Sequence, residues 1–235
     1  MAKTSALPKF IQLSEMLIRE IAAGHLTDGA RLPPERDMAD DLGVAVGTLR
    51  KALADVEAKG LLDRVQGSGN YVRHRPAVDS VYAFFRLELL KGGGLPTAQV
   101  LAVDRLPKPD AFAQLGGHHE GHRIIRLRSL DGVLIALEEI WLDGAQPAQI
   151  AVSDLSDSLY HFYRHDLGVV IASVEDRIGV DPMPAWTPDA FHLKSGEIAG
   201  YVERVSWTAA KEPAEFSRTW YDAKRAVYIS RMGKG

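Results

Sequence analysis

The spacing of apolar residues predicts three helices in the first part of the chain. We expect them to end at Gly24, Gly43 and Gly60, because glycine accommodates the left-handed conformation with which helices often end. The second helix begins at residues 33–35, where proline suits a first helical turn and a glutamate faces the positive end of the helix dipole. The apolar faces consist of Phe10, Leu13, Leu17, Ile18 and Ile21 in the first helix and of Leu49, Leu53 and Val56 in the third.

Two short alternating runs follow, at residues 61–65 and 70–73. They flank the glycine-rich sequence Gln66-Gly67-Ser68-Gly69, and this combination is typical of a β-hairpin. After a helix-turn-helix, such a hairpin is a wing. Its tip can reach phosphates or the minor groove while the second helix of the motif lies in the major groove. Residues 8–75 are therefore predicted to form a winged helix-turn-helix domain.

Beyond a polar, proline-containing connector at residues 76–80, the pattern changes from helices to strands. The sequence Asp131-Gly132 is a strong signal for a two-residue hairpin turn. Because strands follow one another with few helices between them, residues 81–232 are predicted to form an α+β domain with a mainly antiparallel sheet. Strands are expected at residues 100–103, 124–128, 133–138, 169–178, 201–208, 214–221 and 227–230, and helices near residues 110–115, 158–166 and 187–193.

Length and composition limit the class of protein. The 235 residues allow one large or two modest domains, and a hydrophobic content of 46% is enough to build their cores. The chain has no cysteine, which excludes disulfides, thiolate metal sites and cysteine nucleophiles. No apolar run approaches the roughly 18 residues of a membrane span, and residues 1–5 lack a secretion signal. A cytoplasmic protein without a membrane partner is expected.

The charge of the chain argues for local contacts with nucleic acid. A net charge of −3 and a pI of about 6.2 are unsuited to a protein that coats nucleic acid nonspecifically, which needs a broad basic surface. The cations that could form a local contact are Arg36, Arg50, Lys51, Arg64, Arg73 and Arg75. For Arg64 and Arg73, an ordinary solvated position on a strand is an equally good interpretation.

The order and spacing of four motifs resemble the GntR family of bacterial transcription regulators. They are Leu-Pro-x-Glu-Arg at residues 32–36, Gly43-Val44, Thr48-Leu49-Arg50 and the wing sequence at residues 67–72. The resemblance implies binding to double-stranded operator DNA as a homodimer, with Arg36 and Arg50 at positions that contact DNA. The full set of predicted DNA-binding residues is Arg36, Gly47, Thr48, Arg50, Lys51, Gln66, Gly67, Ser68, Gly69 and Tyr71.

One departure from the family pattern concerns the start of the recognition helix. The family often has Ser-Arg there, whereas this chain has Ala45-Val46 and lacks a group that could hydrogen-bond a base edge. Gly47 would allow close approach of the backbone to DNA, and Val46 could touch a thymine methyl. We therefore expect altered specificity rather than lost binding.

The second domain is similar to the effector-sensing UTRA domain of the HutC-like subgroup of GntR regulators. The matching residues are 126–128, 138–142, 158–160 and 215–221. The resemblance implies a chorismate-lyase-like fold that dimerises, binds a small metabolite and has no catalytic role. It also implies that Tyr160 and Tyr221 line the ligand.

The residue chemistry independently favours an anion site in this domain. Arg126 and Arg128 lie two apart on a strand and could grip a carboxylate or phosphate from the same side. The alternative is that Arg126 simply forms a cross-strand ion pair with Glu138. Ser158 begins a helix, whose amide dipoles favour an anion. The predicted ligand-binding residues are Arg126, Arg128, Glu138, Ser158, Tyr160, Glu215 and Tyr221, with Tyr82 and Arg86 as further candidates.

The identity of the effector stays open at this point. Relatives that bind sugar phosphates usually have a loop rich in serine and threonine early in the sensor domain, whereas residues 80–86 here contain a single hydroxyl-bearing serine and a tyrosine. Arg86 could replace that site. A sugar phosphate, a carboxylate, an amino acid derivative and a sulfonate are the candidate effectors.

Two further clusters of polar residues are not interpreted as sites. Residues 118–122 contain three histidines but lie in a glycine-flanked turn, so no metal and no cofactor are predicted. Asp181, Asp189 and His192 lack an accompanying nucleophile motif. The leading hypothesis is a metabolite-responsive repressor and not an enzyme. The alternatives are a lyase-type enzyme acting on a small carboxylate, an activator and an architectural DNA-binding protein.

Overall fold

The computed structural model describes residues 7–74, 80, 82, 84–112, 115–145, 149–155 and 158–231. Arg75 and the connector residues 76–79 lie outside the described residues, as does residue 81. The described residues form two compact units. One contains Leu7–Arg86, Gly93–Leu95 and residues 229–231, and the other contains Leu87–Gly92 and Pro96–Tyr228. We call them the winged unit and the sensor unit.

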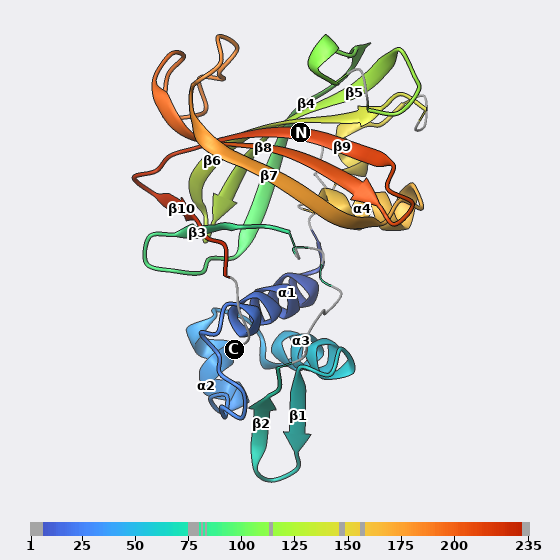
Figure 1. Ribbon diagram of the computed structural model, residues 1–235. Coiled ribbons are helices and arrows are strands. Elements are labelled where there is room, and N and C mark those ends of the chain that lie inside the picture. Colours follow the sequence, from blue (N-terminus) through green and yellow to red (C-terminus); the bar gives the residue numbers. More distant parts are fainter. Residues whose placement is uncertain are drawn as a thin grey trace. The chain divides into compact units, whose positions relative to one another are not determined.

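The winged unit consists of three helices and a hairpin, as the sequence predicts (Figure 1). The helices are α1 (Lys9–Ala22), α2 (Glu35–Asp41) and α3 (Val46–Ala58), and the hairpin strands are β1 (Leu62–Val65) and β2 (Gly69–Val72). Gly43, at a φ of +62°, makes the left-handed turn between α2 and α3. The predicted apolar faces of α1 and α3 pack together with Leu32, Ala39 and Val72 in one buried core.

A buried polar network also connects α1 to α3. Glu15, with 1% of its surface exposed, accepts a hydrogen bond from Lys59 at 3.0 Å and is also bonded to Ser80. Lys59 contacts Asp55 at 2.9 Å, and Ser14 donates to Asp55 at 2.6 Å. A buried carboxylate is costly unless it is paired, so these contacts specify how α1 packs on α3.

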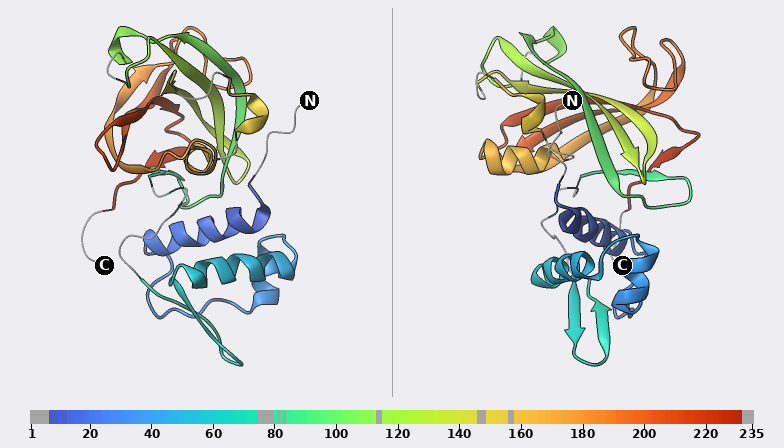
Figure 2. Two further views of the ribbon diagram at one scale, coloured as in Figure 1. Left: turned by 90° about the vertical axis from the view of Figure 1, so that its right-hand side faces the viewer. Right: turned by 180° about the vertical axis from the view of Figure 1, so that it is seen from behind.

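The sensor unit is built on a six-stranded antiparallel sheet in the order β4-β5-β6-β9-β8-β7. The strands are β4 (Pro96–Pro107), β5 (Glu120–Leu130), β6 (Val133–Asp143), β7 (Ile171–Pro182), β8 (Ile198–Thr208) and β9 (Pro213–Tyr221). The predicted turn at Asp131-Gly132 joins β5 to β6, with both residues at positive φ, which confirms the hairpin. The sheet is strongly curved (Figure 2).

Each face of the sheet is covered by different segments. On one face, helix α4 (Leu159–Asp166) packs Leu159, Phe162 and Tyr163 against Ile124 and Ile140. We call this the α4 face. On the other face, Met183 and Phe191 from the β7–β8 connection pack against a core that includes Leu127, Leu137 and Trp220.

Three predicted elements differ from the structure. The helix expected at residues 187–193 is absent, and turns take its place, with hydrogen bonds from Thr187 N to Pro184 O and from Phe191 N to Pro188 O. The prolines of this segment prevent a continuous helical ladder. Near residues 110–115 the described residues contain a 3-10 turn, Asp110–Phe112, while residues 113 and 114 lie outside the described part of the chain. The last predicted strand is β10 (Ala226–Tyr228), which pairs with β3 (Leu87–Leu89), a strand that the sequence did not indicate.

Candidate functional sites

The start of α3 is an exposed surface without a side-chain cap. Ala45 occupies the N-cap position and forms no capping hydrogen bond through its side chain. A Cβ placed on Gly47 would meet no atom within 4 Å, so the backbone there is open to a close approach. Arg50 and Lys51 are exposed on the same helix, and Arg36 is exposed on α2. Compared with the Ser-Arg pair that is common in the family, Ala45-Val46 therefore lacks a hydroxyl and a guanidinium on this surface and leaves no steric obstacle there.

Glu35 binds two arginines, one on helix α3 and one on the wing. Its carboxylate accepts a hydrogen bond from Arg50 Nε at 2.6 Å and another from Arg64 Nη2 at 3.1 Å. The hydrogen bond from Arg50 lowers the pKa of Glu35 against the opposing effect of burial. This one residue of the Leu-Pro-x-Glu-Arg motif thus connects α2 to α3 and to strand β1. Its bridging role was not predicted, because a motif read along the chain does not indicate cross-element partners.

The wing residues divide into paired and unpaired groups. Arg64 also donates to Asn70 at 3.2 Å, and Arg73 pairs with Asp63 across the hairpin at 2.6 Å. Neither arginine is therefore simply solvated. At the tip, Gln66 and Gly67 are exposed, and Ser68 lies 2.6 Å from Tyr71 through their hydroxyl groups. The predicted wing residues are thus close together, with Tyr71 supporting the turn.

A cleft of about 520 Å³ lies between the segment that enters α2 and the wing. Its walls come from residues 31–35 on one side and residues 64–70 on the other. The cations that line it are Arg31 and Arg64, and the single carboxylate is that of Glu35. Arg31 was not among the predicted residues.

In the sensor unit, the strand register places most of the predicted ligand-binding residues on the α4 face. Residues directly opposite one another in a sheet point to the same side. Arg126 is opposite Glu138, and Arg128 is in one row with Ala136, Tyr221 and Gly200. Glu215 is in a neighbouring row, between Leu142 and Ser206.

Arg126, Arg128 and Glu138 form one buried cluster. Arg126 Nε donates to Glu138, and Arg128 Nη2 lies 3.3 Å from the same carboxylate. Burial alone would raise the pKa of Glu138, but the charges of the two arginines outweigh it and lower that pKa. The predicted cross-strand pair is therefore present. It engages only part of Arg126, whose Nη1 atom is buried without a hydrogen-bond partner among the described residues.

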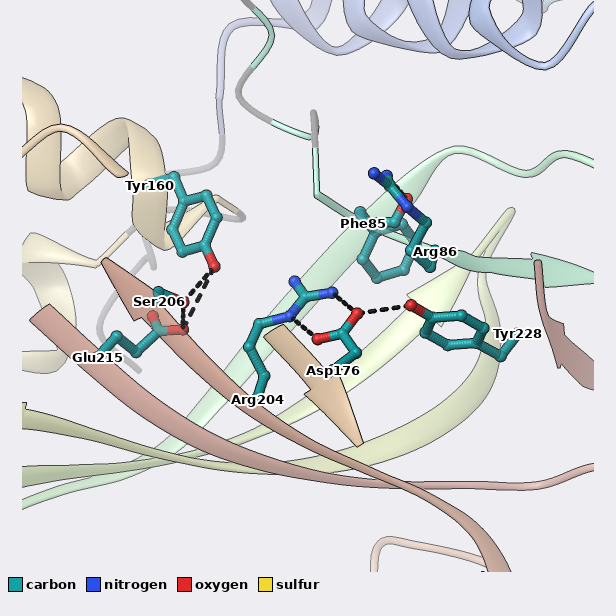
Figure 3. Close-up of polar contacts among 8 residues, drawn as sticks. All are labelled: Phe85, Arg86, Tyr160, Asp176, Arg204, Ser206, Glu215 and Tyr228. Atoms are coloured by element: carbon teal, nitrogen blue, oxygen red, sulfur yellow. Dashed lines mark hydrogen bonds and ion pairs between the residues drawn. The ribbon is translucent and has the colours of Figure 1, made fainter. Parts of the chain in front are cut away.

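Glu215 lies in a separate group of hydroxyl donors (Figure 3). Its carboxylate accepts hydrogen bonds from Tyr163 at 2.6 Å, from Ser206 at 3.2 Å and from Tyr160 at 3.4 Å. Burial raises the pKa of Glu215, because the hydrogen bonds from Tyr163 and Ser206 and the charges of Arg126 and Arg204 only partly offset the loss of water. Tyr160 also lies 2.9 Å from Ser206. The carboxylate is thus fully engaged within the protein.

A third polar group on the α4 face was not predicted. Arg204 on β8 forms a two-point contact with Asp176 on β7, with both distances 2.6 Å (Figure 3). Tyr228 donates to the same carboxylate at 2.6 Å. The side chains of Arg204 and Asp176 share the row of Ile140 and Ser217. Sequence reasoning missed them because their proximity depends on the order of the strands.

The remaining predicted ligand residues have structural contacts of their own. Ser158 caps α4 by accepting a hydrogen bond from His161 N at 3.3 Å. Tyr221 lies so close to Gly200 that a Cβ there would approach its ring to 2.3 Å. Tyr82 and Arg86 belong to the winged unit, where Tyr82 contacts the ring of Phe85 and Arg86 donates to Phe85 O at 3.4 Å.

The clusters that were not interpreted as sites are ordinary polar contacts. Glu120 pairs with Arg105 at 2.7 Å, and His122 is buried within β5. His192 contacts Asp222 at 2.7 Å, and Asp181 accepts a hydrogen bond from Trp220 at 3.1 Å. Within the described ranges, no three His, Cys, Asp or Glu side chains are arranged to hold a metal ion, and no helix is both long and apolar enough to cross a membrane.

Comparisons with known proteins agree with this two-part organisation. Residues 11–72 match the family of bacterial regulatory proteins called gntR, and residues 91–226 match the UTRA domain. The chain is 52% identical over 227 residues to the HTH-type transcriptional regulator SmoD of Agrobacterium fabrum, with 97% of each chain covered. It is 21% identical over 234 residues to the histidine utilization repressor of Pseudomonas putida, which covers 97% of this chain and 93% of that protein.

A solved structure shows the same fold. The regulator YydK of Bacillus subtilis matches with a TM-score of 0.54 at 20% identity, covering 97% of this chain and all of that one. The relatives are transcription regulators, so the lyase-type enzyme is not supported. A winged helix-turn-helix followed by a UTRA domain is the combination that the sequence predicts for the HutC-like subgroup. The chain belongs to the GntR family of DNA-binding transcription regulators, with an effector-sensing UTRA domain.

Proposed function

We propose that this regulator is a repressor that a small anionic effector releases from operator DNA. Residues 8–75 would bind the operator, residues 76–80 would link the domains, and residues 81–232 would bind the effector. The sign of regulation is supported by the name of one relative, a repressor. The exposure of Arg36, Gly47, Arg50, Lys51, Gln66 and Gly67 supports an operator-binding surface at the α3 start and the wing. This surface consists of Arg36, Gly47, Thr48, Arg50, Lys51, Gln66, Gly67, Ser68, Gly69 and Tyr71.

One observation carries the effector proposal, the unsatisfied Nη1 atom of Arg126. This side chain is buried, with 7% of the residue exposed, and a buried guanidinium nitrogen without a partner is costly. Arg126 and Arg128 both contact the carboxylate of Glu138. An anionic group of the effector would satisfy the free donor of Arg126.

The neighbouring groups favour an effector that also has polar substituents. Arg204, Ser206 and Tyr160 lie on or against the same sheet face as Arg126. The guanidinium of Arg204 is paired with the carboxylate of Asp176, and the carboxylate of Glu215 accepts hydrogen bonds from three hydroxyl groups. An anion that carries hydroxyl or amino groups, such as a sugar phosphate, a hydroxylated sulfonate or carboxylate, or an amino acid derivative, fits this chemistry.

A thermal-shift screen of the full-length protein tests the effector class. Sugar phosphates, carboxylates, sulfonates and amino acid derivatives are compared with uncharged sugars of the same size. We expect an anion to stabilise the wild type, by about 2.7 kcal/mol at a concentration of 100 times its Kd. Arg126→Gln should abolish the shift. Arg123→Gln, on the opposite face of β5 and paired with Glu139 at 2.7 Å, should retain it as the matched control.

The outcomes separate the parts of the proposal. Equal stabilisation by neutral sugars, or a full shift with Arg126→Gln, would show that no anionic group of the effector binds to the Arg126 cluster.

Transcription in vitro from a template with the protein's selected DNA site tests the sign of regulation. A repressor lowers the yield of transcript until the effector is added, whereas a rise in yield on adding the protein alone would identify an activator.

We also propose that the protein binds DNA as a homodimer through the sensor unit. One winged domain covers a half-site, and a symmetric partner supplies the second. We place the dimer contact at strand β7, because it is an edge strand on which Ile178 and Val180 are 53% and 73% exposed. An edge strand with exposed apolar side chains is prone to pair with another strand. In an antiparallel pair centred on Gly179, Ile178 would be opposite the partner's Val180.

A further inference from the structure

We propose that Arg31 binds a phosphate of the DNA backbone in the cleft between the entry to α2 and the wing. None of the family motifs in the sequence includes this residue. The cleft has a volume of about 520 Å³ and contains two arginines and one glutamate, so it has an excess of positive charge. It is also bordered by the exposed wing tip, residues 66–68. A phosphate group entering this cleft would meet the guanidinium groups of Arg31 and Arg64, which line it.

The backbone of Arg31 is held firmly against the wing. Arg31 forms a β-bridge with Tyr71, and Leu32 N donates to Asn70 O at 2.9 Å. On the other side of Arg31, Val72 N donates to Ala30 O, also at 2.9 Å. The segment therefore lies alongside β2 like a short third strand. A cation on such a rigid segment loses little freedom when it binds a ligand.

The side chain of Arg31 extends over Gly69. A Cβ built on Gly69 would come within 2.9 Å of Arg31 Nε, so any other residue at position 69 would displace the guanidinium. Gly69 also has a φ of +135°, which a residue with a side chain rarely adopts. The second glycine of the wing thus permits both the turn and the position of Arg31.

Arg31 differs from the other arginines around the cleft in its charge balance. Arg50 and Arg64 are bonded to Glu35, and Arg73 is bonded to Asp63. No described carboxylate lies within ion-pair distance of Arg31. A phosphate contact pairs a protein cation with the negative charge of the DNA backbone. A guanidinium that has no carboxylate partner is therefore better suited to this contact than one that is already in an ion pair.

The position of Arg31 favours a phosphate over a base. It lies on the segment before α2 and beside the wing, not on the recognition helix α3 that would enter the major groove. Contacts from such positions fix the register of a protein on DNA without reading sequence. Loss of Arg31 should therefore weaken binding to all sequences by a similar factor.

The test uses the full-length protein and the duplex that the wild type selects from a random-sequence pool. Binding is measured by fluorescence anisotropy at several salt concentrations between about 50 and 200 mM, with a scrambled duplex in parallel. We expect Arg31→Gln to lower the salt slope by about 2 and to weaken both duplexes roughly 60-fold at 0.1 M salt, because each subunit of the dimer loses one phosphate contact. Arg31→Lys should keep most of the slope, because it keeps the charge.

Arg73→Gln is the matched control, since it removes the same charge from the wing but from an arginine that is already paired. Phosphate ethylation interference adds a second readout. The wild type should be sensitive at a phosphate in each half-site to which Arg31→Gln is insensitive. The proposal is wrong if the slope of Arg31→Gln equals that of the wild type, if Arg73→Gln loses as much, or if only the selected duplex is affected.

Discussion

Glu138 and Glu215 lie on the same face of the sensor sheet and are both buried, yet their pKa values shift in opposite directions. The charges of Arg126 and Arg128 lower the pKa of Glu138 in spite of burial. Glu215 accepts hydrogen bonds from neutral hydroxyl groups, and the charges of Arg126 and Arg204 offset burial only in part, so its pKa is raised. The direct arginine contacts of Glu138 thus distinguish the two carboxylates. The direction of each pKa shift also decides how that residue changes stability with pH.

We expect Glu215→Gln to flatten the pH dependence of sensor stability. The folded-state pKa of Glu215 is raised above its ordinary value of 4.5, so the native state holds the proton to higher pH than the unfolded state. Its contribution to stability is present below pH 4.5 and is lost as pH rises through the folded-state pKa. Glutamine mimics the neutral form and removes this loss.

Tryptophan fluorescence in urea is a suitable measurement, because all four tryptophans, Trp141, Trp186, Trp207 and Trp220, lie in the sensor unit. The free energy of unfolding is compared from pH 5 to pH 8, that is, from about 0.5 to about 3.5 units above the ordinary glutamate pKa of 4.5. Glu212→Gln, at an exposed position beside β9, should follow the wild type. Parallel curves for Glu215→Gln and the wild type would contradict the raised pKa.

A second prediction at the residue scale concerns Glu35. Because it orients Arg50 and Arg64, Glu35→Gln should loosen both arginines while removing a negative charge near the DNA. Affinity for a scrambled duplex should rise slightly, and the ratio of specific to nonspecific affinity should fall by about tenfold, within the 1–3 kcal/mol of one good base contact.

Fluorescence anisotropy with the selected and scrambled duplexes measures this ratio. Glu57→Gln removes the same charge from a residue that also contacts Arg64, at 3.8 Å, but not Arg50. It should leave the ratio unchanged. If both variants changed the ratio equally, net charge and not the orientation of Arg50 would be responsible.

At the scale of elements, the edge strand β7 is distinctive. It has twelve residues, most of them exposed, and no proline until its last position. Native proteins usually protect such an edge with charged residues, bulges or covering segments. Strand β7 has charged residues at positions 175–177 and 181 and a register irregularity at residues 171–173, so its exposed apolar stretch is residues 178–180. Pairing with a second β7 about Gly179 would bury Ile178 and Val180 and place Arg177 opposite the partner's Asp181.

We therefore expect Val180→Lys to convert the protein to a monomer at micromolar concentration. Two lysines would face the apolar side chains of the partner strand, and burial of an unpaired charge opposes association. Sedimentation velocity measures the change. Leu90→Lys, at a residue 62% exposed outside the large sheet, should remain dimeric. A dimeric Val180→Lys variant would place the interface on another surface.

At the scale of the whole molecule, segments from beyond the winged domain take part in the winged unit. Gly93–Leu95 lies within the match to the UTRA domain but belongs to the same compact unit as α1. Arg19 on α1 donates to Gly94 O at 2.9 Å and lies 4.9 Å from the ring centre of Phe85. Helix α1 therefore connects the core of the DNA-binding domain to segments that continue into the sensor.

We expect Arg19→Ala to weaken the coupling between effector and operator. Linkage requires that the effector lower operator affinity by the same factor by which operator DNA lowers effector affinity, typically about 5- to 150-fold. The variant should keep the separate affinities for effector and for operator and reduce only this factor. Calorimetry with and without the selected duplex measures it, with Arg105→Ala, at an arginine of β4 paired with Glu120, as the control. An unchanged factor would exclude Arg19 from the coupling.

Local features of this chain were predictable because their causes lie within a few residues. Apolar periodicity and the helix-ending glycines specify α1, α2 and α3, and the need for positive φ specifies the Asp131-Gly132 turn. The α4 cap at Ser158 is equally local. The ordered motifs indicated both domain families. The predicted site residues on one strand, Arg126 and Arg128, also lie on one side, as the two-residue period of a strand requires.

Other features depend on which segments meet after folding. The Arg204–Asp176–Tyr228 group requires β7 to lie beside β8, and the β3–β10 pair joins residues far apart in the chain. Glu35 meets Arg50 and Arg64 only when α2, α3 and the wing pack together. The sequence determined the elements and their families. The tertiary structure alone decided which charges are paired, since pairing depends on distances between residues that the linear pattern does not contain.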